Sequence, residues 1–270
     1  MSSEKEPSRR RSHPRLRIAL AVILAVVLIC AAAFAVYVNI YYHAEPAAVQ
    51  AMVPDSSVSV YKLWDGVTVF APEEPSAGFI FYPGGKVEDT AYAPLLRACA
   101  ERGVLCVLIR MPFNLAVFNI NGANGIPEQF PDVEHWYLGG HSLGGAMAAS
   151  YVADHADELD GLVLLAAYST RDLTKSGLAV LSVYGSEDGV LDKEKYEQYR
   201  SNLPPGTSEV VIDGGCHAGF GRYGAQAGDG TPAISSDEQI NRTAEELARI
   251  ILTASRRSIV HAQSQQHRDV

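Results

Sequence analysis

The sequence predicts a three-layer α/β/α domain with a mostly parallel central sheet, preceded by one N-terminal hydrophobic helix. Apolar runs of strand length alternate with segments of helical periodicity, which is typical of helices that cover both faces of a parallel sheet. One segment near the N-terminus is apolar over the length of a membrane span. With 47% hydrophobic and 20% charged residues, the chain can bury a core, which excludes a disordered chain.

Residues 1–17 form a basic segment, with six Lys or Arg residues, two Glu residues and a net charge of +4. The next basic residue after Arg17 is Lys62. Lys and Arg that flank a first membrane span tend to stay in the cytoplasm. We therefore expect residues 1–17 to be cytoplasmic and the following domain to be extracytoplasmic.

Residues 18–38 carry no charged side chain and form the predicted transmembrane anchor. As a helix they are long enough to cross a hydrocarbon core of about 30 Å. The alternative is a cleaved secretory signal, for which Ala31-Ala32-Ala33 or Ala33-Phe34-Ala35 offers a small-residue cleavage site. The length favours an anchor in the cell membrane, with the lipid bilayer as a partner, whereas a cleaved signal would make the protein secreted.

Residues 39–56 are expected to be a linker, and residues 57–254 a single domain. The domain opens with a hairpin, because Trp64-Asp65-Gly66 contains the Asp-Gly pair that favours a tight turn. Its two strands are predicted at 58–63 and 67–70. Further apolar runs predict strands at 78–82, 104–111, 136–139, 162–167, 178–184 and 209–212.

Helices are predicted between most of these strands. One ends at Gly103, and its apolar positions are Tyr92, Leu95, Leu96 and Cys99. The last helix is predicted to begin with a capping box formed by Ser236 and Gln239. Its apolar stripe consists of Ile240, Ala244, Leu247 and Ile251. Residues 255–270 are polar and are expected to be a mobile tail.

The charge of the chain argues against a nucleic-acid partner. Beyond residue 17 there are 16 basic and 29 acidic residues, a net charge of −13, whereas binding to phosphates needs clustered Lys and Arg. No cofactor and no metal is expected.

The segment Gly140-His141-Ser142-Leu143-Gly144 is a G-x-S-x-G motif. The motif alone is weak, but here it follows a predicted strand and opens a helix rich in small residues, which is the setting of a nucleophile elbow. Side chains at positions 140 and 144 would collide with the neighbouring strand and helix. Ser142 is therefore the candidate nucleophile, and an idle serine in a glycine-rich turn is the alternative.

A serine needs a base, oriented by a carboxylate, in the chain order Ser, acid, His. His217 is the candidate base, because the other seven histidines lie in the membrane region, near the motif or in the tail. Asp188 is preferred over Glu187 as the acid, and Asp172 is an outside choice. The expected oxyanion donors are the backbone N–H of Leu143 and that of either Gly85 or Lys86.

From about residue 77 to residue 251 the chain resembles the α/β-hydrolases, and it is most similar to compact bacterial members related to dienelactone hydrolase. The resemblance is carried by Tyr82-Pro83-Gly84-Gly85-Lys86, Gly140-His141-Ser142-Leu143-Gly144, Gly185-Ser186-Glu187-Asp188 and Gly215-Cys216-His217. It implies the α/β-hydrolase fold, a triad of Ser142, Asp188 and His217, and hydrolytic or acyl-transfer activity. Dienelactone hydrolases proper have a cysteine in place of Ser142, and Pro83-Gly84 replaces their family's more usual His-Gly, so dienelactone specificity is not implied.

The active site is expected to be open, because only about ten residues separate the strands at 162–167 and 178–184, too few for a cap domain. The apolar residues Phe113, Leu115, Val117 and Phe118 either wall an acyl pocket or form the core face of a helix.

The sequence thus predicts a membrane-anchored, extracytoplasmic serine hydrolase that cleaves a carboxylic ester or thioester through an acyl-enzyme. A small ester or acyl compound is the expected substrate, and the oligomeric state is left open. One alternative is an acyltransferase that uses a sugar or lipid hydroxyl. Another is a non-catalytic interaction module that keeps the fold.

Overall fold

A computed structural model describes residues 14–266 of the chain, which divides into the units Met1–Ile40 and Tyr41–Val270. In the first unit, α1 (Pro14–Asn39) contains the segment Arg17–Asn39, which has a mean hydropathy of 3.1 and is long and apolar enough to cross a membrane. An N-terminal signal sequence has the same property. Most of the predicted basic segment, residues 1–17, lies outside the described residues.

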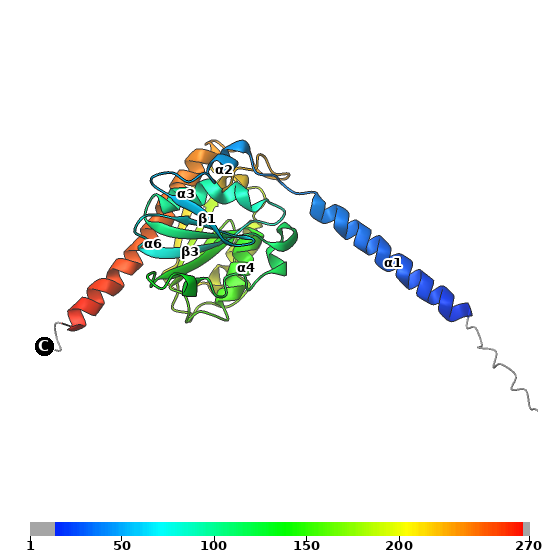
Figure 1. The fold of residues 1–270 in the computed structure, drawn as a ribbon, viewed down its shortest axis with the longest axis horizontal. Coiled ribbons are helices and arrows are strands. Elements are labelled where there is room, and N and C mark those ends of the chain that lie inside the picture. The colour runs from blue at the N-terminus through cyan, green and yellow to red at the C-terminus, as the bar shows by residue number, and fades with distance from the viewer. Residues whose placement is uncertain (1–13, 267–270) are drawn as a thin grey trace, which may run out of the picture. The chain divides into compact units, whose positions relative to one another are not determined.

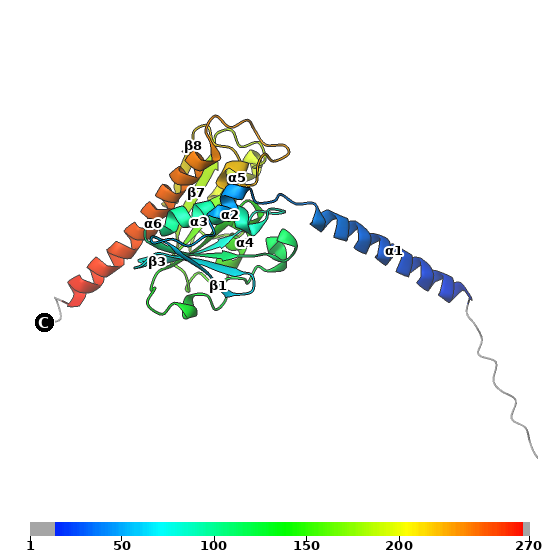
Figure 2. The ribbon, with the colours of Figure 1, turned by 45° about the horizontal axis from the view of Figure 1, so that its top comes forward.

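The described part of the second unit contains an eight-stranded sheet with the order β1-β2-β4-β3-β5-β6-β7-β8 (Figures 1 and 2). The strands β1 and β2 form the predicted antiparallel hairpin, β2 is antiparallel to β4, and the remaining neighbours are parallel. The mostly parallel sheet predicted from the sequence is confirmed. The strands are β1 (Ser59–Trp64), β2 (Val67–Ala71), β3 (Ala77–Tyr82), β4 (Val104–Ile109), β5 (Trp136–His141), β6 (Gly161–Leu165), β7 (Ala179–Gly185) and β8 (Ser208–Ile212).

Two hydrophobic clusters lie on opposite faces of the sheet. In β3, Phe79 and Phe81 belong to one cluster, which includes residues of α3 (Ala93–Ala100) and α6 (Ser236–Gln266). Ile80 and Tyr82 belong to the other, which includes residues of α4 (Leu143–Val152). Figure 1 shows α3 and α4 on opposite sides of the sheet. The predicted three-layer arrangement is confirmed.

The second unit begins before the predicted domain boundary at residue 57. Tyr42 forms a parallel bridge with Val87, and α2 (Pro46–Gln50) follows. Arg97 of α3 donates from Nε to the carbonyl oxygen of Ala51, at 2.9 Å. The residues expected to form a linker therefore pack on the domain from Tyr42 onward.

The start of α6 differs from the predicted capping box. The cap is Ser235, whose Oγ accepts the N–H of Glu238 at 3.1 Å. The side chain of Gln239 is buried and turns away from the helix end to bind both the N–H and the carbonyl oxygen of Cys216, at 2.9 and 2.8 Å. The capping box of Ser236 and Gln239 is therefore wrong, because the backbone before His217 competes for the amide of Gln239. The helix continues to Gln266, and the mobility of residues 255–270 stays a prediction.

The remaining short helices lie in the connections. They are α5 (Lys193–Tyr199) and the 3-10 helices η1 (Asp89–Tyr92), η2 (Pro112–Asn114), η3 (Ala116–Phe118), η4 (Pro127–Gln129), η5 (Arg200–Asn202) and η6 (Ala218–Phe220). The connection from β6 to β7 has neither helix nor strand. Because parallel strands end at one common edge, the loops after β3, β5, β6, β7 and β8 meet there.

Candidate active site

Ser142 occupies a strained turn between β5 and α4. Its φ of 52° and ψ of −119° lie in a region that only glycine adopts without cost. Its N–H donates to the carbonyl oxygen of Leu165 at 2.9 Å, and its own carbonyl oxygen accepts the N–H of Ala146 at 3.0 Å. The neighbouring strand and the first turn of the helix thus hold the strained residue, and its side chain lines a pocket at the carboxyl edge of the sheet.

The glycines of the motif allow the turn to pack directly on the end of β3. A Cβ atom at Gly144 would lie 2.1 Å from the carbonyl oxygen of Tyr82 and 2.3 Å from that of Pro83. A Cβ atom at Gly140 would lie 2.5 Å from the same oxygen of Tyr82. The predicted steric reason for both glycines is confirmed.

His217 and Asp188 form a buried pair, with 1% and 3% of their surface exposed. The Nδ1–H of His217 donates to Asp188 Oδ2 at 2.9 Å, and Oδ1 lies 3.2 Å from the same nitrogen. Oδ1 also accepts the backbone N–H groups of Val190 and Leu191, at 2.9 and 2.8 Å, which fixes the carboxylate.

The second nitrogen of His217, Nε2, is buried and has no hydrogen-bond partner among the described residues. Because Nδ1 carries the hydrogen that is hydrogen-bonded to Asp188, a neutral imidazole has its lone pair on Nε2. His217 and Ser142 line the same pocket. A buried polar atom without a partner is uncommon in native structures, so Nε2 of His217 is a candidate for contact with a molecule bound in the pocket.

The two other candidate acids lie apart from His217. Glu187 is exposed and accepts the hydroxyl of Ser186 at 2.9 Å. Asp172 is exposed and accepts both the N–H and the hydroxyl of Thr174, at 2.9 and 2.7 Å. Of the three candidate carboxylates, the structure brings Asp188 to the imidazole.

The candidate oxyanion donors differ in whether their N–H group already forms a hydrogen bond within the protein. The N–H of Lys86 donates to the carbonyl oxygen of Asn114 at 2.7 Å, so it is already bound within the protein. Gly85 lies against Leu143, since a Cβ atom at Gly85 would lie 3.3 Å from the Cβ of Leu143. Of the two residues that the sequence left open, Gly85 therefore stays the candidate donor, because the N–H of Lys86 is already bound.

The pocket that contains Ser142 and His217 has a volume of about 410 Å³. Its walls come from α4 and from the loops after β6 and β7, and most of them are apolar. No Lys or Arg is among the described residues that line it. They are Ser142, Leu143, Ala146, Met147, Ser150, Ala166, Ala167, Tyr168, Thr170, Val190, Leu191, Asp192 and His217.

The apolar residues after β4 lie outside this pocket. Leu115 is buried, but Phe113, Val117 and Phe118 are 53%, 44% and 50% exposed. They lie on the 3-10 helices η2 and η3, separated by extended backbone at Leu115. The interpretation as the core face of a helix is therefore wrong for these three residues, and they are not among the residues that line the pocket of Ser142.

Asp229 is a residue that the sequence analysis missed. Its carboxylate accepts four backbone N–H groups, from Gly189, His217, Ala218 and Gly230, at 2.8 to 3.1 Å. Partial burial opposes its ionisation, but these hydrogen bonds lower the pKa of Asp229 below the ordinary aspartate value. An ionised Asp229 thus ties the loop of the acid to the loop of the base. Its place between Gly228 and Gly230 was the available signal, and that pair predicts only a turn.

We expect Asp229→Asn to lower kcat by about 10- to 100-fold, because hydrogen bonds to a charged group contribute about 1.5–3 kcal/mol each and the amide cannot accept on both sides. Steady-state kinetics on p-nitrophenyl acetate would measure the loss. The matched control is Asp213→Asn, which changes an exposed residue in the loop that carries His217. Equal rates for the two variants would show that the carboxylate of Asp229 does not position His217.

His141 is buried and is not among the residues that line the pocket. The hydroxyl of Tyr92 accepts the N–H of Gly84 at 3.1 Å and forms a hydrogen bond of 2.8 Å with His141 Nδ1. The ring centroids of His141 and His217 are 4.5 Å apart. Burial, and then the neighbouring His217, hold the pKa of His141 well below the ordinary histidine value. His141 is therefore neutral in the folded protein.

This burial predicts a loss of stability in acid. The unfolded chain binds a proton at His141 near pH 6.5, whereas the folded chain binds it only at lower pH. The free energy of unfolding therefore falls as the pH drops below about 6.5, by up to about 1.4 kcal/mol per pH unit from this residue. Urea unfolding of wild type and His141→Asn between pH 5 and 8 would test this, with His155→Asn as control. The slope should become shallower in His141→Asn alone.

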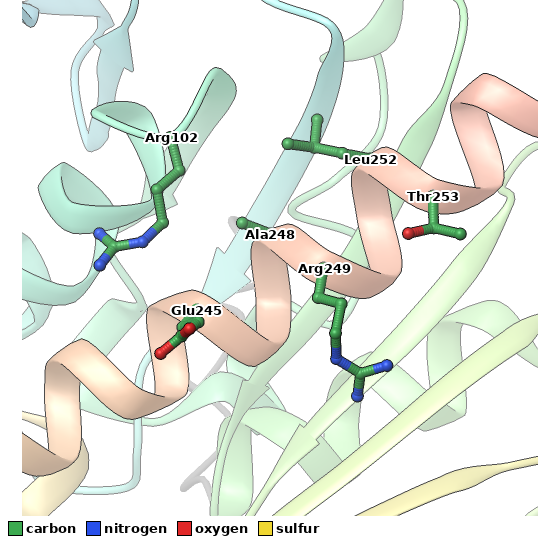
Figure 3. A pocket seen from close by; sticks show the side chains of 6 residues that line it. All are labelled: Arg102, Glu245, Ala248, Arg249, Leu252 and Thr253. Atoms are coloured by element: carbon green, nitrogen blue, oxygen red, sulfur yellow. The ribbon is translucent and has the colours of Figure 1, made fainter.

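A second hollow lies between the end of α3 and the middle of α6, with a volume of about 440 Å³ (Figure 3). Arg102 lies two residues before β4, at the amino end of that strand, so this hollow is at the opposite edge of the sheet from Ser142. Arg102 donates to the carbonyl oxygen of Ala98 at 2.7 Å, and Arg249 pairs with Glu246. Figure 3 shows the two guanidinium groups turned to different sides. The hollow is lined by Arg102, Glu245, Ala248, Arg249, Leu252 and Thr253, which do not include a nucleophile with a base.

Comparisons with known proteins agree with this geometry. The model of the alpha/beta hydrolase family matches residues 78–241, more than half of the chain. The esterase domain of a Rhodothermus marinus protein has a TM-score of 0.53 and is 15% identical, over 74% of this chain and 98% of its own. Est1E from Butyrivibrio proteoclasticus has a TM-score of 0.52 and is 16% identical, over 73% and 99%. A predicted CIB-like hydrolase from Thermoplasma acidophilum has a TM-score of 0.52 and is 14% identical, over 72% and 100%. These structures are similar in fold, and no curated protein matched the chain.

Proposed function

The chain belongs to the α/β-hydrolase family, and on that premise we propose that it is a serine hydrolase that cleaves a carboxylic ester or thioester through an acyl-enzyme. One observation carries the proposal. The Nδ1–H of His217 donates a hydrogen bond to the fixed carboxylate of Asp188, and its buried Nε2, without a partner among the described residues, shares a pocket with Ser142. This arrangement suits a base that receives a proton from Ser142.

Each residue then has one role. Nε2 of His217 takes the proton of the Ser142 hydroxyl while Oγ attacks the carbonyl carbon of the substrate. Asp188 stabilises the imidazolium, and the N–H groups of Leu143 and Gly85 bind the developing oxyanion. The imidazolium gives its proton to the leaving alcohol or thiol, which leaves the acyl group on Ser142. Water, deprotonated by His217, then releases the acid.

The proposed location is the outer surface of the cell membrane, with α1 as an uncleaved anchor. The hydropathy of Arg17–Asn39 and the basic residues before it support this proposal. Protease added to intact cells should digest the domain and leave the N-terminus protected. Activity found entirely in the medium, on a chain that starts near Val36, would instead show a cleaved signal.

Labelling with a fluorophosphonate probe tests the proposed chemistry on the full chain in detergent. We expect one labelled peptide, the one that contains Ser142, and a panel of p-nitrophenyl esters of increasing chain length would then define the acyl preference. A chain that is neither labelled nor active on any ester of the panel would be a non-catalytic member of the family.

A further inference from the structure

Three large apolar side chains, Phe113, Val117 and Phe118, form an exposed cluster on η2 and η3, which we call the aromatic ridge. The rings of Phe113 and Phe118 meet edge to face, with centroids 5.6 Å apart. Phe113 has a φ of 56°, a conformation that bulky side chains rarely adopt, and Asn114 follows with a φ of 55°. Single exposed apolar residues are common, but a cluster on strained backbone indicates a surface with a partner.

The ridge is joined to the candidate oxyanion loop. The carbonyl oxygen of Asn114, within the ridge segment, accepts the N–H of Lys86 at 2.7 Å. Lys86 directly follows Gly85. In addition, η3 packs against α4, the helix that begins after Ser142. The ridge therefore lies beside the elements that form the catalytic pocket.

The same loop is joined to the end of the hydrophobic helix. Tyr42 donates its N–H to the carbonyl oxygen of Lys86 at 2.7 Å, and its own carbonyl oxygen accepts the N–H of Glu88 at 2.9 Å. Only Ile40 and Tyr41 separate Tyr42 from Asn39, the last residue of α1. An extended chain advances at most about 3.6 Å per residue, so the covalent chain holds Tyr42 within about 11 Å of Asn39. An anchor at α1 thus keeps the oxyanion loop close to the membrane surface.

We propose that the aromatic ridge enters the outer surface of the bilayer and that the substrate is a neutral acyl ester that resides in that bilayer. The inference rests on the proposed hydrolase activity and on the anchor. The net charge of −13 beyond residue 17 disfavours attraction to anionic lipids, so binding relies on burial of the apolar ridge. The pocket walls are mainly apolar and include Asp192 but no Lys or Arg among the described residues, which suits an uncharged ester.

The test uses the full chain reconstituted in phosphatidylcholine vesicles that contain a fluorogenic diacylglycerol ester. Its hydrolysis is compared with that of water-soluble p-nitrophenyl acetate by the same vesicles. The ridge variant Phe113→Ser/Phe118→Ser should keep its rate on the acetate and lose about tenfold on the vesicle ester. The matched control is Val211→Ser on β8, an equally exposed apolar residue at one end of the sheet, which should keep both rates. Equal rates of ridge variant and wild type on the vesicle ester overturn the proposal.

A second measurement reads membrane contact without activity. A dye is attached to Phe118→Cys, or to Val211→Cys as control, in a Cys30→Ser background, since the other cysteines are buried. Spin-labelled acyl chains in the vesicle should quench the dye at position 118 and not at position 211. Quenching by a wild-type chain that is neither labelled by the fluorophosphonate nor active on any ester of the panel would refute the hydrolase and keep the membrane contact. An unquenched dye at position 118 would show that the ridge faces water. A dye signal that depends on protein concentration would show that the ridge contacts a second copy of the chain. Either result overturns the proposal.

Discussion

Replacing Ser142 by alanine is expected to lower kcat on p-nitrophenyl esters by about 10⁴-fold or more, and His217→Ala should do the same. The reason is that the two side chains perform one step. Oγ attacks only as His217 Nε2 removes its proton, so either change abolishes the same event. The double variant should therefore be little worse than each single variant. Steady-state kinetics and active-site labelling would measure all three.

Ser150→Ala is the matched control for this prediction. Ser150 lies on α4 and lines the same pocket as Ser142, so its removal changes the local polarity without touching the proposed proton transfer. We expect kcat to stay within a few fold of wild type, because an idle pocket hydroxyl contributes only about 0.5–1.5 kcal/mol of net interaction. Losses that multiply in the double variant would mean that Ser142 and His217 act in separate steps.

The sequence was sufficient to predict the sheet and to place the three candidate catalytic residues at one edge of it, because both depend on local patterns. Each apolar run becomes a strand where it can be buried, and parallel strands bring their carboxyl ends to one edge. The positions of Ser142, Asp188 and His217 follow from this rule, as each residue comes shortly after its strand. The preference for Asp188 over Glu187 agrees with the hydrogen bond to His217.

Contacts between distant segments could not be predicted in the same way. The N–H of Lys86 is bound by Asn114, and the amide of Gln239 is drawn from its helix end to Cys216. Asp229 accepts N–H groups from two other loops that the sequence keeps apart, at Gly189 and at His217 and Ala218. A local motif contains no information on such partners, since several side chains compete for each donor and the fold decides between them.

The apolar spacing of residues 113–118 is a second case in which a local pattern did not predict the structure. A helical interpretation of this spacing expects a buried face, yet the backbone turns into the left-handed region at Phe113 and Asn114. The hydrogen bond from Lys86 to Asn114 joins this turn to the loop after β3. Hydrophobicity alone therefore indicated a cluster at this place without indicating whether its side chains are buried or exposed.

Asp188→Asn is expected to lower kcat by about 10⁴-fold while the protein stays folded. Oδ1 of Asp188 accepts the N–H groups of Val190 and Leu191, so an asparagine would keep its oxygen on those donors. Its amide nitrogen would then face His217 Nδ1, in the place where Oδ2 of Asp188 now accepts a hydrogen bond from Nδ1 at 2.9 Å. That amide donates, so Nδ1 would have to accept, and the imidazole proton would move to Nε2. His217 would thus have the wrong tautomer to receive a proton from Ser142, with the geometry of the site preserved.

Glu187→Gln is the control that isolates this effect, since it makes the same chemical change one residue earlier. Glu187 is exposed and binds the hydroxyl of Ser186, so its charge can be lost without a change in the tautomer of His217. We expect kcat within about threefold of wild type, in the range of an exposed ion or hydrogen bond. Direct NMR observation of the imidazole N–H would separate tautomer from geometry, with the proton on Nδ1 in wild type and Glu187→Gln and on Nε2 in Asp188→Asn. A large loss of kcat in Glu187→Gln together with a mild one in Asp188→Asn would assign the acid to Glu187, because only the carboxylate that orients His217 controls which nitrogen is free to act as the base.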